Sequence, residues 1–495
     1  MLSVKRTLSA LLASLMLAST LAACSSTPSD DTSDTDTTAA EETTVGETKN
    51  PNEDNLPERD FKGEEFTFLV RKELGYEFEA EDDGDVVNAA VYSRNLTLSE
   101  RFKVNFKYVQ QPGIWTYKDT YSELITSTTL AGDDAFDIIT GQSNIVLPLA
   151  VQHVYHDLAN AEHIDFSKPY WKEGYHSNAT VNGRLYSLMG DYAVSTIADS
   201  NVVVFNMKLF DNNKIEYPYQ LVKDGKWTLD TFIELSAKFS RDVDGDGKMT
   251  AADQFGYTTY NNGLNPFIYS TGCTIFDTDD SGKRVLNFPD EKEVNAFDRI
   301  FDFCATSVFA NLDGAEIKAG IGGANSSERW ANAFKMNHSA FTSGRLKEVE
   351  GLRDMESDFG ILPYPKYDEN QEDYITSVLR TVTVASLPIT VKEPEKCTFL
   401  LEAMASYGFI NIIPAYYEFA LKGKVARDAL TAEMLDIVAT TTYFAFSDVF
   451  YAELGASDML TSYILSGRKG LVSFFEAKKG TIEQKLADLL KAYAE

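Results

Sequence analysis

An alternation of strand-like and helix-like segments near the start of the chain is the feature that most restricts its fold. The strand-like segments are 66–70, 104–109 and 136–141, and the helix-like segments between them are 88–102 and 117–130. Strand–helix–strand–helix–strand order predicts parallel pairing with right-handed crossovers, and so an α/β fold. Ligands of such sheets bind beyond the carboxyl ends of the strands, which makes Gln142 a candidate site residue.

Similar signals continue to the end of the chain. Strands are expected at 359–363 and 381–387, a strand that runs into the start of a helix at 201–210, and helices at 227–239, 397–409, 433–438 and 471–493. We also expect a strand–turn–strand over 265–288 and a helix over 292–309. With 495 residues, of which 44% are hydrophobic, the chain is long enough for two or three domains with a large core.

The first 23 residues have the pattern of a secretory signal peptide. Lys5 and Arg6 provide positive charge, and residues 8–21 form an uncharged apolar run that is too short for a confident membrane span. Residues 24–60 are rich in Ser, Thr, Asp and Glu and poor in apolar side chains. Such a segment cannot bury enough surface to fold, so we expect a disordered acidic tether before a body that starts at Phe61.

The end of the leader, Leu21-Ala22-Ala23-Cys24, resembles a bacterial lipobox. The resemblance implies that Cys24 is lipidated, for example with palmitate, and anchors the chain at the extracellular face of the cell membrane. The alternative is an ordinary secretory signal with an incidental cysteine. The other cysteines, at 273, 304 and 397, are widely spaced and form no C-x-x-C pair, which argues against a structural zinc site.

The formal net charge of −30 bears on the class of partner. A strongly acidic surface repels nucleic acid and anionic lipid, and no basic stripe offsets it. The expected partners are neutral or cationic solutes, or proteins.

The sharpest local motif is an acidic loop over residues 242–253. It fits the calcium-loop pattern D-x-[DN]-x-[DN]-G-x5-E, except that its last position is aspartate instead of glutamate. The predicted ligands are the carboxylates of Asp242, Asp244 and Asp246, the backbone carbonyl of Lys248 and the carboxylate of Asp253. We expect a structural calcium ion; the alternative is a solvated acidic turn.

Five passages together resemble bacterial extracellular solute-binding proteins of the carbohydrate-type (family 1) class, which feed ABC importers. They are 136–139 (FDII), 183–186 (GRLY), 204–210 (VFNMKLF), 227–232 (WTLDTF) and 360–365 (GILPYP). The resemblance implies the two-lobed periplasmic-binding-protein-like (type II) fold, in which each lobe is a mixed sheet flanked by helices and the ligand cleft lies between the lobes. It also implies a monomer that binds a small solute, closes by hinge bending and delivers the solute to ABC permease subunits.

By the same resemblance, the N-terminal lobe comprises 61–190 and 359–412, and the C-terminal lobe comprises 191–358 and 413–495. The chain is expected to cross between the lobes near 188–192, 359–364 and 411–417. Aromatic rings stack on sugar faces, and amides and carboxylates bind hydroxyls. Candidate ligand-binding residues at predicted loops or crossings are Trp115, Gln142, Trp171, Asp191, Tyr192, Asn265, Trp330 and Tyr416.

Motifs of catalysis are largely missing from the sequence. It contains no G-x-S-x-G, no Walker loop and no dinucleotide glycine fingerprint. His153 and His156 are spaced for a shared helix face, so a zinc-binding lipoprotein is a minor alternative. With 75 acidic residues a carboxylate pair must lie close together, so a secreted glycan-acting enzyme stays open, as does a sensor or adhesion lipoprotein of the same fold. We expect a solute-binding receptor that is not an enzyme, with an oligosaccharide as the favoured ligand.

Overall fold

The computed structural model describes residues 50–422 and 429–494. The expected leader, Cys24 and the first part of the expected tether lie outside these residues. The end of the expected tether belongs to the folded body. Within it, Asp54 forms an ion pair with Arg101 at 2.8 Å, and Arg59 forms one with Glu395 at 2.6 Å. The body therefore begins before Phe61, because charged side chains in this stretch have partners on it.

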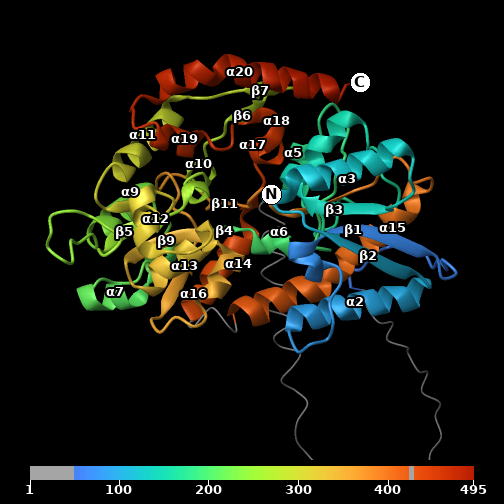
Figure 1. Ribbon diagram of the computed structural model, residues 1–495, viewed down its shortest axis with the longest axis horizontal. Helices are drawn as coiled ribbons and strands as arrows, with labels where there is room; N and C mark the ends of the chain where they lie inside the picture. The colour runs from blue at the N-terminus through green and yellow to red at the C-terminus, as the bar shows by residue number, and fades with distance from the viewer. Residues whose placement is uncertain (1–49, 423–428, 495) are drawn as a thin grey trace, which may run out of the picture. The chain divides into compact units, whose positions relative to one another are not determined.

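A four-stranded sheet forms the core of the first lobe. Its order is β12 (Thr383–Ser386), β3 (Ile138–Gln142), β1 (Glu65–Arg71) and β2 (Asn105–Gln111). Strands β1, β2 and β3 pair in parallel, as the alternation at the start of the chain predicts, and β12 is antiparallel to β3. In Figure 1, α3 (Lys118–Ala131) lies above this sheet and α2 (Val86–Phe102) lies below it. Asp85 caps α2 by accepting hydrogen bonds from the backbone N–H groups of Val87 and Asn88.

A five-stranded sheet forms the core of the second lobe. Its order is β10 (Phe359–Leu362), β4 (Asn201–Asn206), β9 (Ser339–Arg345), β5 (Phe255–Thr259) and β8 (Phe309–Asn311). Strand β4 runs antiparallel to both β10 and β9, so this sheet is mixed. Two small pairs complete the strands: β11 (Thr376–Ser377) with β13 (Thr442–Tyr443), and β6 (Phe276–Thr278) with β7 (Arg284–Leu286).

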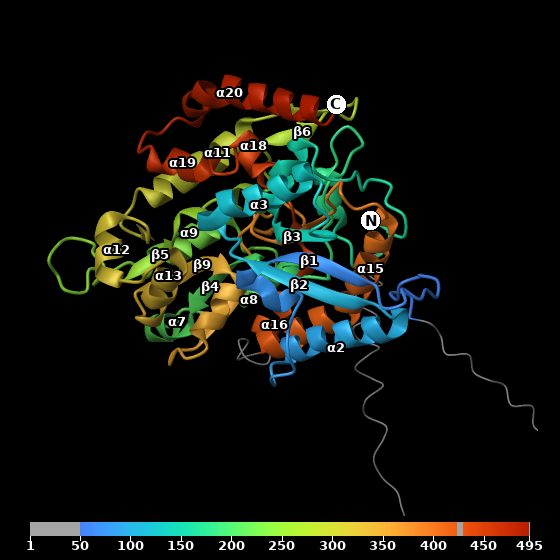
Figure 2. The ribbon, with the colours of Figure 1, turned by 45° about the vertical axis from the view of Figure 1, so that its right-hand side comes forward.

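Helices surround both sheets, as Figures 1 and 2 show. Near the first sheet lie α4 (Ser143–Val146), α5 (Glu173–Ala179) and α15 (Pro394–Tyr407). Near the second lie α7 (Met207–Asn213), α8 (Tyr219–Lys223), α9 (Leu229–Ala237), α10 (Pro266–Ser270), α11 (Glu291–Cys304), α12 (Ala315–Ile321), α13 (Ser326–Lys335), α14 (Leu346–Val349) and α16 (Ala429–Thr440). Short 3-10 turns are η1 (Lys72–Glu77), η2 (Trp115–Tyr117), η3 (Leu147–Gln152), η4 (Asn261–Gly263) and η5 (Glu350–Leu352). The architecture is therefore a mixed α/β fold of two lobes.

The second segment that crosses between the sheets lies later in the chain than we expected. Strand β10 pairs with β4 in the second lobe, so residues 359–362 do not belong to the first lobe. The chain returns to the first sheet only at β12, after Leu379 donates a backbone hydrogen bond to Asp199. The crossing is therefore at about 378–382, beside the first crossing that contains α6 (Ser195–Ala198). The other lobe boundaries stay predictions.

The third connection is helical. Helix α15 continues into the π-helical segments η6 (Gly408–Ile412) and η7 (Ala415–Lys422). This continuous helix, 394–418, is the one described helix that is long and apolar enough to span a membrane, but 67% of its most apolar window is buried within the protein. Such burial is typical of a helix in a protein core.

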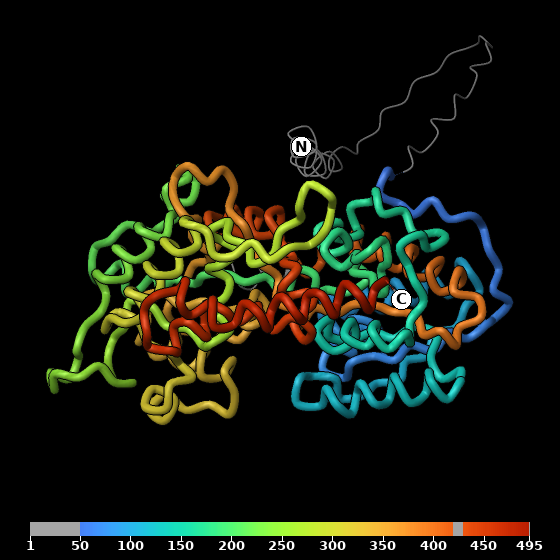
Figure 3. The backbone as a smooth tube through the Cα atoms, turned by 90° about the horizontal axis from the view of Figure 1, so that it is seen from above, coloured from blue at the N-terminus to red at the C-terminus, as the bar shows by residue number. Residues whose placement is uncertain are grey.

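The C-terminal segment contacts both lobes. It consists of α17 (Phe446–Val449), α18 (Tyr451–Leu454), α19 (Met459–Leu465) and α20 (Leu471–Ala492). Helix α20 crosses the body lengthwise in Figure 3. Near its start the ring of Phe475 lies 4.9 Å from that of Phe288, and at its end Tyr493 lies 5.2 Å from Tyr186. Phe288 precedes α11 of the second lobe, and Tyr186 belongs to the first.

Candidate ligand-binding site

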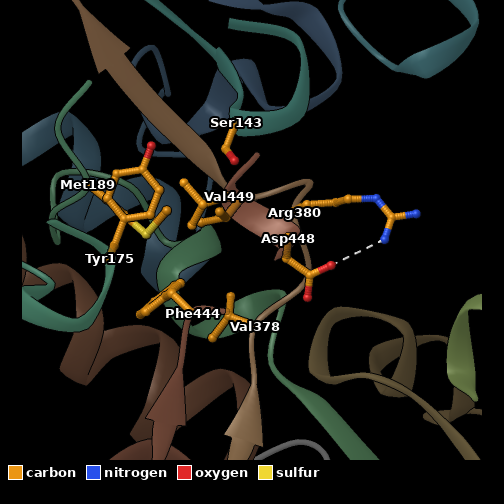
Figure 4. A pocket seen from close by; sticks show the side chains of 9 residues that line it. Ser143, Tyr175, Met189, Val378, Arg380, Phe444, Asp448 and Val449 are labelled. Carbon is orange, nitrogen blue, oxygen red and sulfur yellow. Dashed lines mark ion pairs between the residues drawn. The ribbon is translucent and has the colours of Figure 1, made fainter. Parts of the chain in front are cut away.

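The two crossings and the C-terminal segment enclose a small cavity between the lobes. Its volume is about 10 Å³, which is room for about one water molecule. Its lining residues are Ser143, Tyr175, Met189, Val378, Arg380, Val382, Phe444, Asp448 and Val449. Figure 4 shows apolar side chains around one part of the cavity and an ion pair of Arg380 with Asp448 at another. Ser143 follows β3 directly, so the cavity lies at the carboxyl end of a first-lobe strand, where α/β sheets bind ligands.

Arg380 is the centre of a polar cluster beside this cavity. Its guanidinium pairs with Asp458 at 3.2 Å and with Asp448 at 3.5 Å, and its side chain is only 8% exposed. The guanidinium carbon also lies 3.7 Å from the centroid of the Tyr451 ring, so Arg380 covers one face of that ring. Burial raises the pKa of Asp448 to about 6, although the charge of Arg380 opposes the rise. Two carboxylates against one guanidinium leave the cluster with a surplus of negative charge above that pH.

Two of the residues predicted from the sequence meet at this cluster. The Trp115 ring is 45% exposed and lies 5.7 Å from the Tyr451 ring, in an edge-to-face arrangement. The Asn265 amide donates a hydrogen bond to Asp458 at 2.9 Å, and its carbonyl oxygen accepts one from the backbone N–H of Thr461. Trp115 comes from the first lobe and Asn265 from the second, so the cluster joins both lobes.

Gln142 lies close by, at the end of β3. It is only 4% exposed, and its side-chain oxygen has no hydrogen-bond partner among the residues the structure describes. The side-chain oxygen of Asn144 is likewise buried without a partner in the described chain. A buried acceptor without a donor costs free energy, which a ligand hydroxyl at this edge would recover.

Five other sequence candidates lie in the protein core, so we do not retain them. They are Trp171, Asp191, Tyr192, Trp330 and Tyr416, each 3% exposed or less. Two of them also use their polar atoms for contacts within the protein. The indole N–H of Trp171 donates a hydrogen bond to Glu402 at 2.7 Å, and Asp191 forms an ion pair with Lys172 at 2.7 Å. Large aromatic side chains gain the most free energy from burial, which explains why most of these positions are structural.

Four residues of this cluster were not predicted from the sequence: Arg380, Tyr451, Asp448 and Asp458. No motif marks them, and Arg380 is about 70 positions away from the other three. Only the packing of the C-terminal segment against the crossing brings them together. The one sign in the sequence was the length of the chain after the third crossing, which is longer than a single lobe needs.

The acidic loop has part of the geometry that a calcium site needs. One carboxylate oxygen from each of Asp242, Asp244 and Asp246 lies within 4.8 Å of the others. Gly245 and Gly247 have φ of 75° and 81°, which permits the sharp turns of the loop. The carboxylate of Asp253 closes the loop by accepting backbone hydrogen bonds from Val243 at 2.8 Å and Thr250 at 2.7 Å. The carboxylates of Asp242, Asp244 and Asp246 therefore converge as candidate calcium ligands, whereas the carboxylate of Asp253 already accepts hydrogen bonds within the loop.

Sequence comparison identifies no relative: no protein-family model and no curated protein matches the chain. Structure comparison finds many proteins of similar fold. An ABC substrate-binding protein of Listeria monocytogenes, solved with cycloalternan, aligns with a TM-score of 0.54 at 12% identity over 86% of this chain and 99% of that one. A cyclo/maltodextrin-binding protein solved with maltotetraose gives 0.54 at 14% identity, with 87% and 96% covered.

A third structure of similar fold is M. tuberculosis UspC, with a TM-score of 0.55 at 14% identity over 85% of this chain and all of that one. At these identities the likeness establishes the fold and leaves the ligand open. The two sheets, the crossings between them and these alignments agree, and the chain has the two-lobed α/β fold of the Listeria monocytogenes ABC substrate-binding protein, of the cyclo/maltodextrin-binding protein and of UspC.

Proposed function

We propose that this chain is a solute receptor that binds an oligosaccharide between its lobes and delivers it to an ABC importer. The observation that carries the proposal is the cluster of Trp115, Tyr451, Arg380 and two aspartates where the lobes meet. Aromatic rings offer faces for sugar rings, and carboxylates, guanidinium and amide groups bind hydroxyls. The structural neighbours solved with cycloalternan and maltotetraose support a carbohydrate ligand.

The mechanism we propose needs no covalent chemistry. A sugar ring that stacks on Tyr451 takes the place of Arg380 on the ring face, and Arg380 then turns its donors to the sugar hydroxyls. A ligand that contacts both lobes stabilises the closed arrangement by its differential affinity for it. The surplus of negative charge in the cluster favours neutral sugars over acidic ones.

Thermal unfolding of the purified protein with a panel of neutral oligosaccharides tests this function. A sugar at 100 times its Kd is expected to stabilise the native state by about 2.7 kcal/mol and to raise Tm in a saturable way. Tyr451→Ala is expected to abolish this shift, whereas Tyr92→Ala, which removes an exposed tyrosine on α2, is expected to retain it. Release of sugar products during the incubation would instead support the glycan-acting enzyme.

We also propose that the receptor is a monomer held at the extracellular face of the membrane by lipid on Cys24. The support is the lipobox-like end of the leader and the acidic segment after it, which can keep the body at a distance from the membrane. Incorporation of labelled palmitate into the wild-type chain, and its loss in Cys24→Ser, is the expected result. Labelling that persists in Cys24→Ser would disprove the anchor.

A structural calcium ion in the 242–253 loop is a further part of the proposal, supported by the convergence of Asp242, Asp244 and Asp246. Carboxylate oxygens in this spacing suit calcium, and bound metal stabilises the native state. Calcium is expected to raise Tm, and EGTA to reverse the rise. Asp242→Asn is expected to abolish the response, because the first position of the loop pattern takes aspartate alone, while Asp279→Asn, in another exposed acidic turn, leaves it intact. An equal response to calcium in both variants would show that the loop is a solvated acidic turn and not a calcium site.

A further inference from the structure

A second and much larger cavity lies within the first lobe, beside α5. Its volume is about 480 Å³, which falls in the range of about 300–1,000 Å³ typical of small-molecule sites. Its lining residues are Ala159, Asn160, Phe166, Glu173, His176, Ser177, Thr180, Gly183 and Leu185. None of them lines the cavity between the lobes. This cavity is therefore separate from the site of the proposed function.

The walls of this cavity combine one aromatic ring with several hydrogen-bonding groups. Phe166 is half-buried, with its ring centroid 4.9 Å from that of His176. The side chains of Asn160 and Glu173 are exposed and have no hydrogen-bond or ion-pair partner among the described residues. The Ser177 and Thr180 hydroxyls donate to backbone carbonyls of α5, so their oxygens are free to accept further hydrogen bonds.

His176 adds a hydrogen-bond donor without an acceptor. Its Nε2 accepts the backbone N–H of Met189 at 3.0 Å, which places the proton of the neutral ring on Nδ1. That Nδ1 is buried and has no partner in the described part of the chain. Burial lowers the pKa of His176 to about 3, and the nearby Lys172 adds to the effect, so the ring stays neutral near pH 7. This N–H is closed off from solvent, so a ligand oxygen can satisfy it only where the cavity wall shifts to expose it.

The charge of the lining indicates the chemical class of the ligand. Glu173 is the one carboxyl group in this lining, and neither lysine nor arginine is among the lining residues, so the cavity disfavours anions. An aromatic face surrounded by amide, hydroxyl and imidazole groups suits a ring that carries many hydroxyls. We propose that this cavity is a second binding site, which takes a small neutral carbohydrate of one or two rings.

Helix α5 lies between the two sites. Tyr175 lines the cavity between the lobes and its neighbour His176 lines the second cavity, while Met189, which donates to His176, lines the first. A test of the second site must therefore tell direct binding from an effect passed on from the first.

Selective labelling of the five histidines with ¹⁵N provides a local reporter. The His176 signals are assigned by comparison with His176→Gln, whose spectrum lacks them. Titration of the protein with D-glucose, D-galactose or N-acetyl-D-glucosamine is expected to shift the His176 signals in a saturable way for at least one sugar, and D-glucuronate is not. Asn160→Ala, at an exposed position, is expected to weaken this binding by about 10-fold.

Two tryptophan substitutions complete the test. Ser177→Trp fills the cavity and is expected to abolish the shift. Ser127→Trp is its matched control, because both serines are exposed helix residues whose hydroxyls donate to the carbonyl three residues earlier at 3.3 Å. The shift is expected to persist in Ser127→Trp and in Tyr451→Ala. A shift retained by Ser177→Trp, a shift abolished by Tyr451→Ala, or no saturable shift with any neutral sugar would each overturn the second site.

Discussion

Asp199→Asn is expected to lower the free energy of unfolding by about 3–5 kcal/mol. Asp199 lies in the first crossing, is fully buried, and pairs with Lys347 at 2.6 Å and with Arg345 at 3.3 Å. The substitution keeps the size of the side chain but leaves two largely buried cations without this counter-charge. Urea unfolding at neutral pH measures the loss.

The pH dependence of this effect has a definite sign. Burial alone would raise the pKa of Asp199, but Lys347 and Arg345 outweigh burial and hold the pKa below its ordinary value. The stabilisation is therefore fully present above the pKa of the unfolded chain, about 3.9, and is lost as the pH falls through the folded pKa. The difference between wild type and Asp199→Asn is expected to shrink at the acid end of the titration.

A matched control is the exposed pair of Asp302 and Lys469, with a distance of 2.6 Å and side chains 58% and 48% exposed. Exposed pairs contribute about 0–1 kcal/mol, so Asp302→Asn is expected to change stability little. Equal losses of unfolding free energy in the two variants would show that the buried ion pairs of Asp199 stabilise the protein no more than an exposed pair does.

Trp227→Ala is expected to cost about 3–5 kcal/mol of unfolding free energy. The Trp227 ring is fully buried, packs 5.7 Å from Phe341 of β9, and donates from its indole nitrogen to the Pro363 carbonyl at 2.9 Å. Its removal leaves a cavity and an unsatisfied carbonyl in the second lobe. Urea or thermal unfolding gives the value.

Trp115→Ala provides the contrast, because the same substitution at a 45% exposed position leaves no comparable cavity. We expect its stability to stay within about 0.5 kcal/mol of wild type, as for most surface substitutions. Its response to oligosaccharide is expected to weaken, since Trp115 borders Tyr451. A large loss of stability in Trp115→Ala with unchanged sugar response would reverse the roles of the two tryptophans.

Local patterns in the sequence were enough to predict most of the elements around the two sheets. Strands β1, β2 and β3 and helices α2 and α3 occur within a few residues of their predicted bounds, since each has a clear apolar period. Helix α10 was missed within a predicted strand–turn–strand. All five of its residues are buried, so its apolar run gives no helical period.

The candidate site could be predicted only in part, because it depends on contacts between distant segments. Trp115 and Asn265 were found, but their meeting point at Arg380 and Tyr451 depends on short helices of four to seven residues, α17 to α19, which leave no periodic signal. Conversely, Trp171 and Trp330 looked suitable as ring platforms, and only their burial separates them from Trp115.

Helix α20 has a consequence for the route by which a solute enters. Its 22 residues span about 33 Å, with Phe475 held by Phe288 at one end and Tyr493 held by Tyr186 at the other. Near its C-terminal end, the side-chain amide of Asn182 also donates to the Leu490 carbonyl. Both lobes are thus fastened to one rigid rod along one side of the body. While these contacts hold, the lobes cannot part along that side, and a solute must approach the Tyr451 cluster from a direction that α20 leaves open.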